Sequence, residues 1–205
     1  MSELAVEQSD AVIVARVKAG EAGAFSLLVA RYQSPLLRVA RSRLGRLDWA
    51  EDVVQETFLA AFKSCAGYDP RYEFRTWLWT ILLNQCAAHY HRRIRREETA
   101  QSALAAPPVA GANGRETDDV TPLVALLNKE RSEQLESLLL QLSLVQADAL
   151  RLRFFAGLKF QEIAVAMQCS LNTAKNRVRW GLMRMAELIQ TAGTGATVCD
   201  LDEER

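Results

Sequence analysis

The chain has 205 residues, enough for one or two small domains, each with its own core. Its 25 basic and 25 acidic side chains cancel, its N-terminus is mixed polar, and no apolar run approaches 18 residues. These features argue against a secretory signal and a membrane helix, so we expect no membrane insertion and a cytoplasmic location. The four cysteines form no CxxC pair, which is typical of a reducing compartment.

The zero net charge is a sum of opposing blocks. Residues 61–96 carry seven basic and two acidic side chains, and residues 151–190 carry the same numbers. Residues 97–150 carry three basic and nine acidic ones. A phosphate backbone responds to the local field of each block, so the overall balance does not exclude nucleic acid as a partner.

The first part of the chain predicts three short helices. Asp10 is placed to cap a helix that is stopped by Gly20. Apolar residues at helical spacing predict a second helix over residues 21–33. Ser34-Pro35 then restarts the chain, with proline at a first helical position, and the third helix ends at Gly45.

A longer helix is predicted from Asp48 to about Lys63. Asp48 and Glu51 have the spacing of a capping box, which marks a helix start. From Phe74 the pattern is again helical until the basic run that ends at Arg96. The apolar side of the first of these two helices is expected to comprise Val53, Val54, Phe58, Leu59 and Phe62.

Residues 98–121 lack periodicity and are rich in Ala, Gly, Pro, Asn and Asp, as expected of a flexible linker. Helical patterns resume at Pro122 and continue to Gln190. We therefore predict an all-α fold of two small helical domains, residues 10–97 and 122–190. An acidic tail, residues 191–205, either is frayed or masks the basic helix of the second domain.

The second domain contains the pattern of a helix-turn-helix. Phe160, Ile163, Ala164 and Met167 fall at i, i+3, i+4 and i+7, on one face of a short helix. After an interruption, Ser170 is placed as the N-cap of a second helix. The inward residues of that second helix are expected to be Ala174, Val178, Leu182, Met185 and Ile189.

The outer side of this second helix is polar and basic. In the helix-turn-helix layout such a helix enters the major groove, where Lys and Arg can pair with guanine and Asn with adenine. A helical hairpin with a solvated polar face is the alternative for this stretch taken alone. We expect Thr173 and Arg177 on phosphate, and Lys175, Asn176 and Arg179 on base edges.

Longer motifs carry a resemblance to a known family. Asp52–Phe58 (DVVQETF), with Phe74–Ile81 (FRTWLWTI) and Asn84, closely resembles the first domain of extracytoplasmic-function sigma factors. These are the short, two-domain promoter-recognition subunits of bacterial RNA polymerase. Gly157–Ala164 (GLKFQEIA) and Ser170–Val178 (SLNTAKNRV) are similar to the helix-turn-helix with which that family reads the −35 element.

The resemblance covers about residues 10–96 and 122–189 and implies an alternative sigma factor. It implies core RNA polymerase (clamp helices and flap), promoter DNA and an anti-sigma factor as partners. The helix that begins at Asp48 would dock on the clamp helices through Asp52, Gln55 and Glu56, although spacing alone fits a solvated acidic face.

The same resemblance assigns melting and capture of the −10 element to residues 68–96. Single strands are held by aromatic platforms and basic grooves, and this stretch has both. The family usually has an aspartate four residues after the asparagine, where this chain has Ala88, so the −10 base preference stays open. The residues expected at the −10 element are Trp79, Asn84, His89, Arg92 and Arg93.

Other classes of protein fit the sequence less well. The chain has no Gly-rich phosphate loop and no G-x-S-x-G motif, so we expect neither catalysis nor a cofactor. Cys86, His89 and His91 could ligate a metal, but their spacing separates them around a helix, so no metal is expected. A duplex-binding helix-turn-helix regulator with a helical sensor domain is the alternative, and it would not need residues 52–58 or the aromatic and basic stretch.

Overall fold

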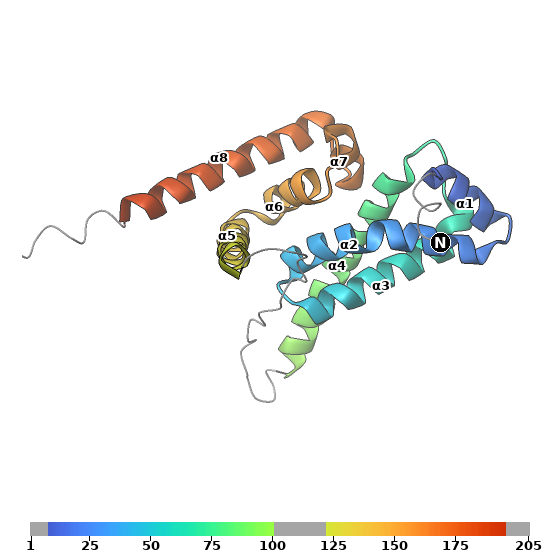
Figure 1. The fold of residues 1–205 in the computed structure, drawn as a ribbon, viewed down its shortest axis with the longest axis horizontal. Helices are drawn as coiled ribbons and strands as arrows, with labels where there is room; N and C mark the ends of the chain where they lie inside the picture. Colours follow the sequence, from blue (N-terminus) through green and yellow to red (C-terminus); the bar gives the residue numbers. More distant parts are fainter. Residues whose placement is uncertain (1–7, 101–121, 196–205) are drawn as a thin grey trace, which may run out of the picture.

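The computed structural model describes residues 8–100 and 122–195, and every element in these ranges is helical (Figure 1). The all-α prediction is confirmed. The predicted linker beyond residue 100 and the tail beyond residue 195 lie outside the described residues. The first domain comprises α1 (Asp10–Lys18), η2 (Ala22–Ala24), α2 (Phe25–Leu44), α3 (Leu47–Ser64), η3 (Cys65–Gly67) and α4 (Phe74–Ala100).

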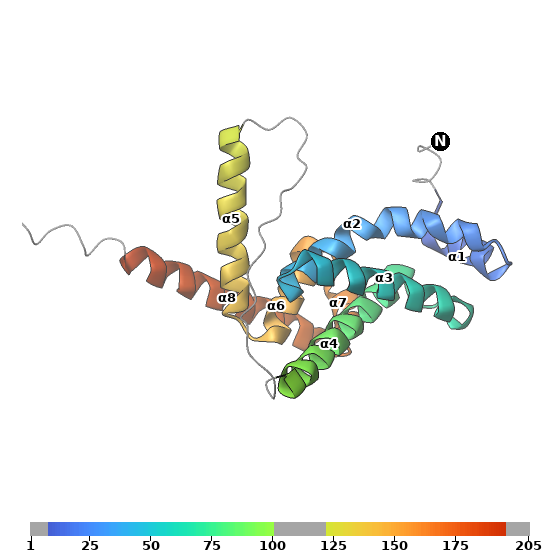
Figure 2. The same cartoon turned by 90° about the horizontal axis from the view of Figure 1, so that it is seen from below.

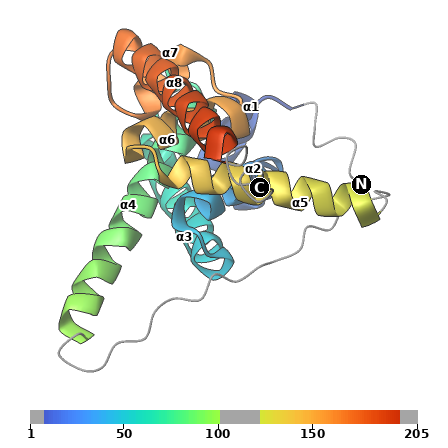
Figure 3. The ribbon, with the colours of Figure 1, turned by 90° about the vertical axis from the view of Figure 1, so that its left-hand side faces the viewer.

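The second domain contains a shorter set of helices. It comprises α5 (Pro122–Leu140), α6 (Leu144–Leu150), the π-helical turn η4 (Arg151–Phe155), α7 (Phe160–Ala166) and α8 (Leu171–Gly195). Helix α5 projects away from the other helices of this domain (Figure 2). Helix α4 extends from the opposite side of the molecule, so the basic run near its C-terminal end is presented well away from the first domain's core (Figure 3).

The core of the first domain lies between α2, α3 and α4. Leu28, Leu36 and Val39 of α2 are fully buried, and Val53 of α3 and Leu82 of α4 pack with them. These three helices pack on one another pairwise, so the core fixes the side of α4 that remains exposed.

Two predicted helices of the first domain form one continuous helix. The predicted break at Ser34-Pro35 is wrong, because α2 runs through Pro35. Proline inside a helix removes one hydrogen bond and costs about 3 kcal/mol. Leu28 and Leu36, on opposite sides of Pro35, lie on the same buried face, and their packing offsets this cost.

Two predicted caps are also wrong. Ser9, not Asp10, caps α1 and accepts a hydrogen bond from the Val12 N–H at 3.4 Å. The Asp10 carboxylate instead accepts hydrogen bonds from Arg31 and Tyr32 of α2. Helix α3 begins one residue before Asp48, whose carboxylate pairs with the Arg46 guanidinium at 2.6 Å. In both cases a charged partner competes successfully for the carboxylate that the pattern assigned to the backbone.

The predicted inner faces are partly wrong at their edges. Leu59 and Phe62 of α3 were expected in the core but are 58% and 42% exposed. In α8, Leu182 and Ile189 are exposed, and the buried stripe runs through Ala174, Val178 and Gly181. The α8 helix also continues through residues 191–195, which were expected to be frayed.

Gly181 permits the close approach of α6 and α8. A Cβ atom at this position would lie 3.0 Å from Cδ1 and 3.2 Å from Cγ of Leu150, which is tighter than ordinary contact. The glycine is buried, so a larger side chain has no route to solvent. The distance between α6 and α8 therefore depends on Gly181, a residue that the periodicity of apolar side chains does not identify.

We predict that Gly181→Leu destabilises the second domain by about 1–3 kcal/mol, because the added atoms overpack the contact with Leu150. Denaturant unfolding followed by circular dichroism measures the change. Met183→Leu, at a half-exposed position of the same helix, is the control and should leave the midpoint unchanged. Equal stability of the two variants would show that the α6–α8 contact is not tight.

Candidate nucleic-acid interface

The turn between α7 and α8 has the geometry of a helix-turn-helix. Helix α7 ends at Ala166, and the chain reverses through Gln168, whose φ of 50° lies in the left-handed region. The Cys169 N–H donates to the Ala164 carbonyl at 2.8 Å, which closes the turn. The predicted cap is confirmed: the Thr173 N–H donates to the Ser170 hydroxyl at 3.1 Å.

Helix α8 is anchored from beneath, and its outer side is open. Ala174 and Val178 are buried against α6 and α7. Lys175, Asn176 and Arg179 are exposed, and their side chains form no hydrogen bond or ion pair with any residue that the structure describes. The capped first turn and the buried stripe thus position α8. The hydrogen-bonding groups of its three outer polar side chains take no part in holding the helix in place. Thr173 and Arg177 are half-buried beside them.

In the first domain, α4 presents one polar face to solvent. Asn84, Ala88, His91 and Arg95 fall at i, i+4, i+7 and i+11 and are all exposed. The small Ala88 lies between Asn84 and His91 on this face, so the position where the family has an acidic residue is open here. The predicted −10 set includes Asn84, and the helical register over three turns places His91 and Arg95 of the basic run on the same face.

Two other predicted −10 residues of α4, His89 and Arg93, lie against α3 instead. Arg93 is half-buried, with its guanidinium carbon 3.8 Å from the centre of the Trp49 ring. Arg46 lies on the same ring at 4.8 Å, and the His89 ring centre lies 5.5 Å from that of Trp49. Cation–π stacking of this kind holds the Arg93 side chain against the Trp49 ring and leaves it only partly exposed.

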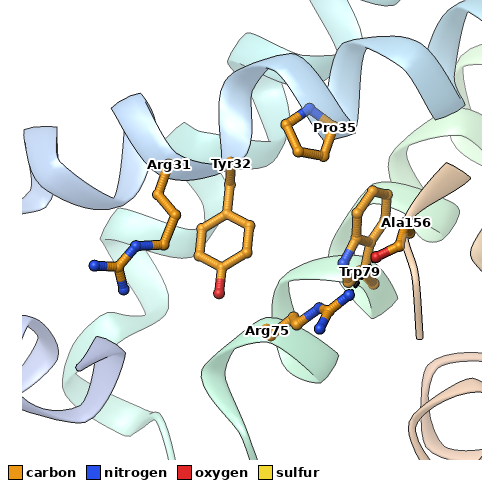
Figure 4. A pocket seen from close by; sticks show the side chains of 6 residues that line it. All are labelled: Arg31, Tyr32, Pro35, Arg75, Trp79 and Ala156. Atoms are coloured by element: carbon orange, nitrogen blue, oxygen red, sulfur yellow. Dashed lines mark hydrogen bonds between the residues drawn. The ribbon is translucent and has the colours of Figure 1, made fainter. Parts of the chain in front are cut away.

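Trp79 lies at the junction of the two domains. Its side chain is 1% exposed, and its indole N–H has no hydrogen-bond partner among the described residues. It lines a pocket of about 230 Å³ together with Arg75 of α4 and Ala156 of the second domain (Figure 4). In this arrangement Trp79 is not accessible to a DNA base, although its role at the −10 element stays a prediction.

The outer face of α3 is acidic and apolar. Asp52 and Gln55 are exposed, and Leu59 follows Gln55 by one turn on the same face. Glu56 is half-buried and pairs with Arg92 of α4 at 2.8 Å. This ion pair connects a residue predicted to bind polymerase with one predicted to bind DNA, so the two surfaces are adjacent in the structure.

The described residues offer no metal site and no membrane segment. No group of three or more His, Cys, Asp or Glu side chains within residues 8–100 and 122–195 could hold a metal ion. Cys86 is buried, whereas His91 is exposed on the opposite side of α4. No helix in the described ranges is long and apolar enough to cross a membrane.

Together these features define a two-domain DNA-binding protein with a helix-turn-helix in the second domain. Comparison with known proteins narrows the class. The family model for Sigma-70 region 2 matches residues 28–97, and that for Sigma-70, region 4 matches residues 132–185. The RNA polymerase sigma-H factor of Pseudomonas aeruginosa is 30% identical over 172 residues, which are 84% of this chain and 89% of that protein.

A second relative and two solved structures agree with this result. The ECF RNA polymerase sigma-E factor of Haemophilus influenzae is 30% identical over 91% of this chain and 96% of its own length. The structure of CnrH in complex with the cytosolic domain of CnrY has a TM-score of 0.65 at 24% identity, covering 90% of this chain and 99% of that one. The sigma factor RpoE of Bartonella quintana, solved with the anti-sigma factor NepR, has a TM-score of 0.64 at 22% identity and covers 81% and 96%.

The chain therefore belongs to the sigma-70 family, in its group of extracytoplasmic-function RNA polymerase sigma factors. The resemblance inferred from the sequence motifs is confirmed. The fold of CnrH and of the sigma factor RpoE is also the fold of this chain.

We predict that His89 titrates below the ordinary histidine value of 6.5. Burial against Trp49 and the positive charge of Arg92 lower its pKa, because both disfavour the protonated ring. The part of the stability that depends on neutral His89 is thus present above pH 6.5 and is lost as the pH falls through that value towards the folded-state pKa. NMR titration of the His91→Asn variant, which leaves His89 as the chain's single histidine, measures this pKa. A value at or above 6.5 would contradict the burial argument.

Proposed function

We propose that this sigma factor directs initiation by three separate surfaces of its two domains. The exposed face of α3 binds core RNA polymerase through Asp52, Gln55 and Glu56. The polar face of α4 captures the −10 strand, with Asn84 on a base or the backbone and Arg92 on phosphate. The outer side of α8 reads the −35 duplex. Trp79, His89 and Arg93 complete the proposed −10 set.

The main support for the proposal is that three polar side chains of α8 are exposed and unpaired among the described residues. Lys175, Asn176 and Arg179 are exposed and unpaired within the described structure, on a helix whose first turn is capped and whose opposite side is buried. Lysine and arginine in the major groove pair with guanine O6 and N7, and asparagine pairs with adenine N6 and N7. A helix that only covered its own domain would not need three adjacent unpaired donors.

The chemistry of the chain is binding rather than catalysis. We propose that it has no catalytic activity of its own and acts in the cytoplasm, where polymerase and DNA are found. We also propose that an anti-sigma factor regulates it, because a solved sigma factor of the same fold is in complex with one. The acidic and apolar face of α3 is a suitable contact for core polymerase, since Leu59 would be buried there.

Run-off transcription with purified core polymerase on a library of promoter-like templates tests the proposal. The wild-type protein should give specific initiation, and the selected templates would supply both promoter elements. Lys175→Ala should weaken initiation about 5- to 150-fold by removing a base contact worth about 1–3 kcal/mol. Gln55→Ala should lower initiation at limiting polymerase.

Arg184→Ala is the matched control on α8. Arg184 is exposed but pairs with Glu187 at 2.9 Å and lies more than one turn beyond Arg179, so its loss should have little effect. Duplex binding by the chain alone, with no initiation on any template, would contradict the proposal. That result would instead favour a helix-turn-helix regulator that works without polymerase.

Leu59→Asp should weaken binding to core polymerase about tenfold or more. Leu59 is 58% exposed, so the substitution should not change folding, but it places a charge where an apolar side chain would be buried on binding. Binding of the labelled protein to core polymerase and its melting temperature are both measured. Val12→Asp, at another half-exposed position of the first domain, is the control. Unchanged binding by Leu59→Asp would remove Leu59 from the proposed interface.

A further inference from the structure

Helix α8 carries a large exposed aromatic side chain to which none of the proposed surfaces gives a role. Trp180 is 55% exposed, and Met183, about one turn further along the helix, is 52% exposed. Neither side chain belongs to the hydrophobic core. Among the described residues, the indole N–H of Trp180 has no hydrogen-bond partner and its ring contacts no other aromatic ring. The packing of the second domain therefore does not account for this tryptophan.

Trp180 lies beside the residues proposed to read the −35 element. It follows Asn176 by four residues, so the two side chains share one face of α8. Long side chains on a helix lean back towards its N-terminus, and the indole ring therefore covers surface next to Asn176. Ala174 and Val178, which anchor α8, lie on its other side. In Figure 1, α8 lies on the side of the second domain that faces away from α2 and α4.

The surroundings of Trp180 on α8 are basic rather than apolar. Residues 171–180 contain three basic side chains and no acidic one. Arg179 is adjacent to Trp180 in the sequence, and Arg177 precedes it by three residues. An apolar groove of a protein partner would remove these charges from water without supplying counterions, which is costly. The phosphates of a duplex match them, so the charge around Trp180 favours DNA as its partner.

The major groove offers one kind of apolar group to such a side chain. Among the four bases, thymine alone presents a methyl group there, at C5, and apolar side chains recognise it by direct contact. The remaining groups on the base edges are hydrogen-bond donors and acceptors, which the carbon face of an indole cannot satisfy. Contact between the Trp180 ring and a thymine methyl would remove apolar surface of both from water.

We propose that Trp180 is a specificity-determining residue that recognises a thymine methyl group in the −35 element. The inference rests on the proposed function of α8. Four residues of helix rise about 6 Å, and successive base pairs are about 3.4 Å apart. The thymine therefore lies within about two base pairs of the base that Asn176 reads. Met183 extends the apolar surface on the far side of the ring.

Replacement of single thymines by deoxyuridine tests this assignment, because it removes only the methyl group. Run-off transcription is measured at limiting holoenzyme, with the full chain, core polymerase and a template selected from the promoter library. Each −35 thymine is replaced in turn, on either strand. For the wild type, one replacement should lower initiation about 3- to 5-fold, which is the effect of one buried methyl group.

Trp180→Ala should lower initiation on the thymine template by at least the same factor and remove the difference between thymine and deoxyuridine. Trp180→Phe keeps an apolar ring and should keep part of that difference. Because Trp180 is more than half exposed, circular dichroism should show unchanged folding of both variants. Lys175→Ala is the matched control on the same helix: it should lower initiation on both templates by equal factors and leave their ratio as in the wild type.

Three results would overturn the inference. The first is equal initiation by the wild type on the thymine template and on every deoxyuridine template. The second is a Trp180→Ala variant that still distinguishes thymine from deoxyuridine as the wild type does. The third is a selected −35 element without thymine. Absence of initiation by the wild type on every template would instead contradict the proposed function, and the inference about Trp180 would fall with it.

Discussion

One carboxylate organises the contact between the two domains. Asp148 lies between an arginine of each domain, and the Arg151 side chain continues to the end of α2. The positions of α6 and η4 relative to α2 are therefore linked through one charged side chain, Asp148 of α6. The α4–α7 contact is consistent with this placement and adds apolar packing beside it.

The physical chemistry of this cluster favours a defined geometry more than it adds stability. Burial raises the pKa of the Asp148 carboxyl and lowers that of Arg151, even though each group faces the other's opposite charge. Desolvation is the larger effect on both, so much of the attraction between the charges is offset by their removal from water. Such a cluster specifies one geometry strongly while stabilising it only modestly. Breaking one member is costly, whereas separating the domains rehydrates all of them together.

The sequence was sufficient for features that depend on local spacing. The helix-turn-helix, its Ser170 cap and the exposed polar side of α8 follow from residues within one or two turns of each other. Failures occur where a distant group competes. Arg31 and Tyr32 take the Asp10 carboxylate from the helix start, and packing of Leu28 and Leu36 carries α2 through Pro35. Periodicity showed that Leu59 lies on an apolar stripe, but not that the neighbouring helices cover only part of that stripe.

Contacts between the domains were beyond sequence reasoning for the same reason. Arg43 and Asp148 are separated by more than a hundred residues, and neither position differs in pattern from a solvated charge. Yet the contact between the domains leaves Lys175, Asn176 and Arg179 exposed, so it does not cover the surface proposed to read the −35 element. The contact between the domains and the proposed reading of the −35 element are thus carried by different residues, and a change at Arg43 leaves the exposed side chains of α8 in place.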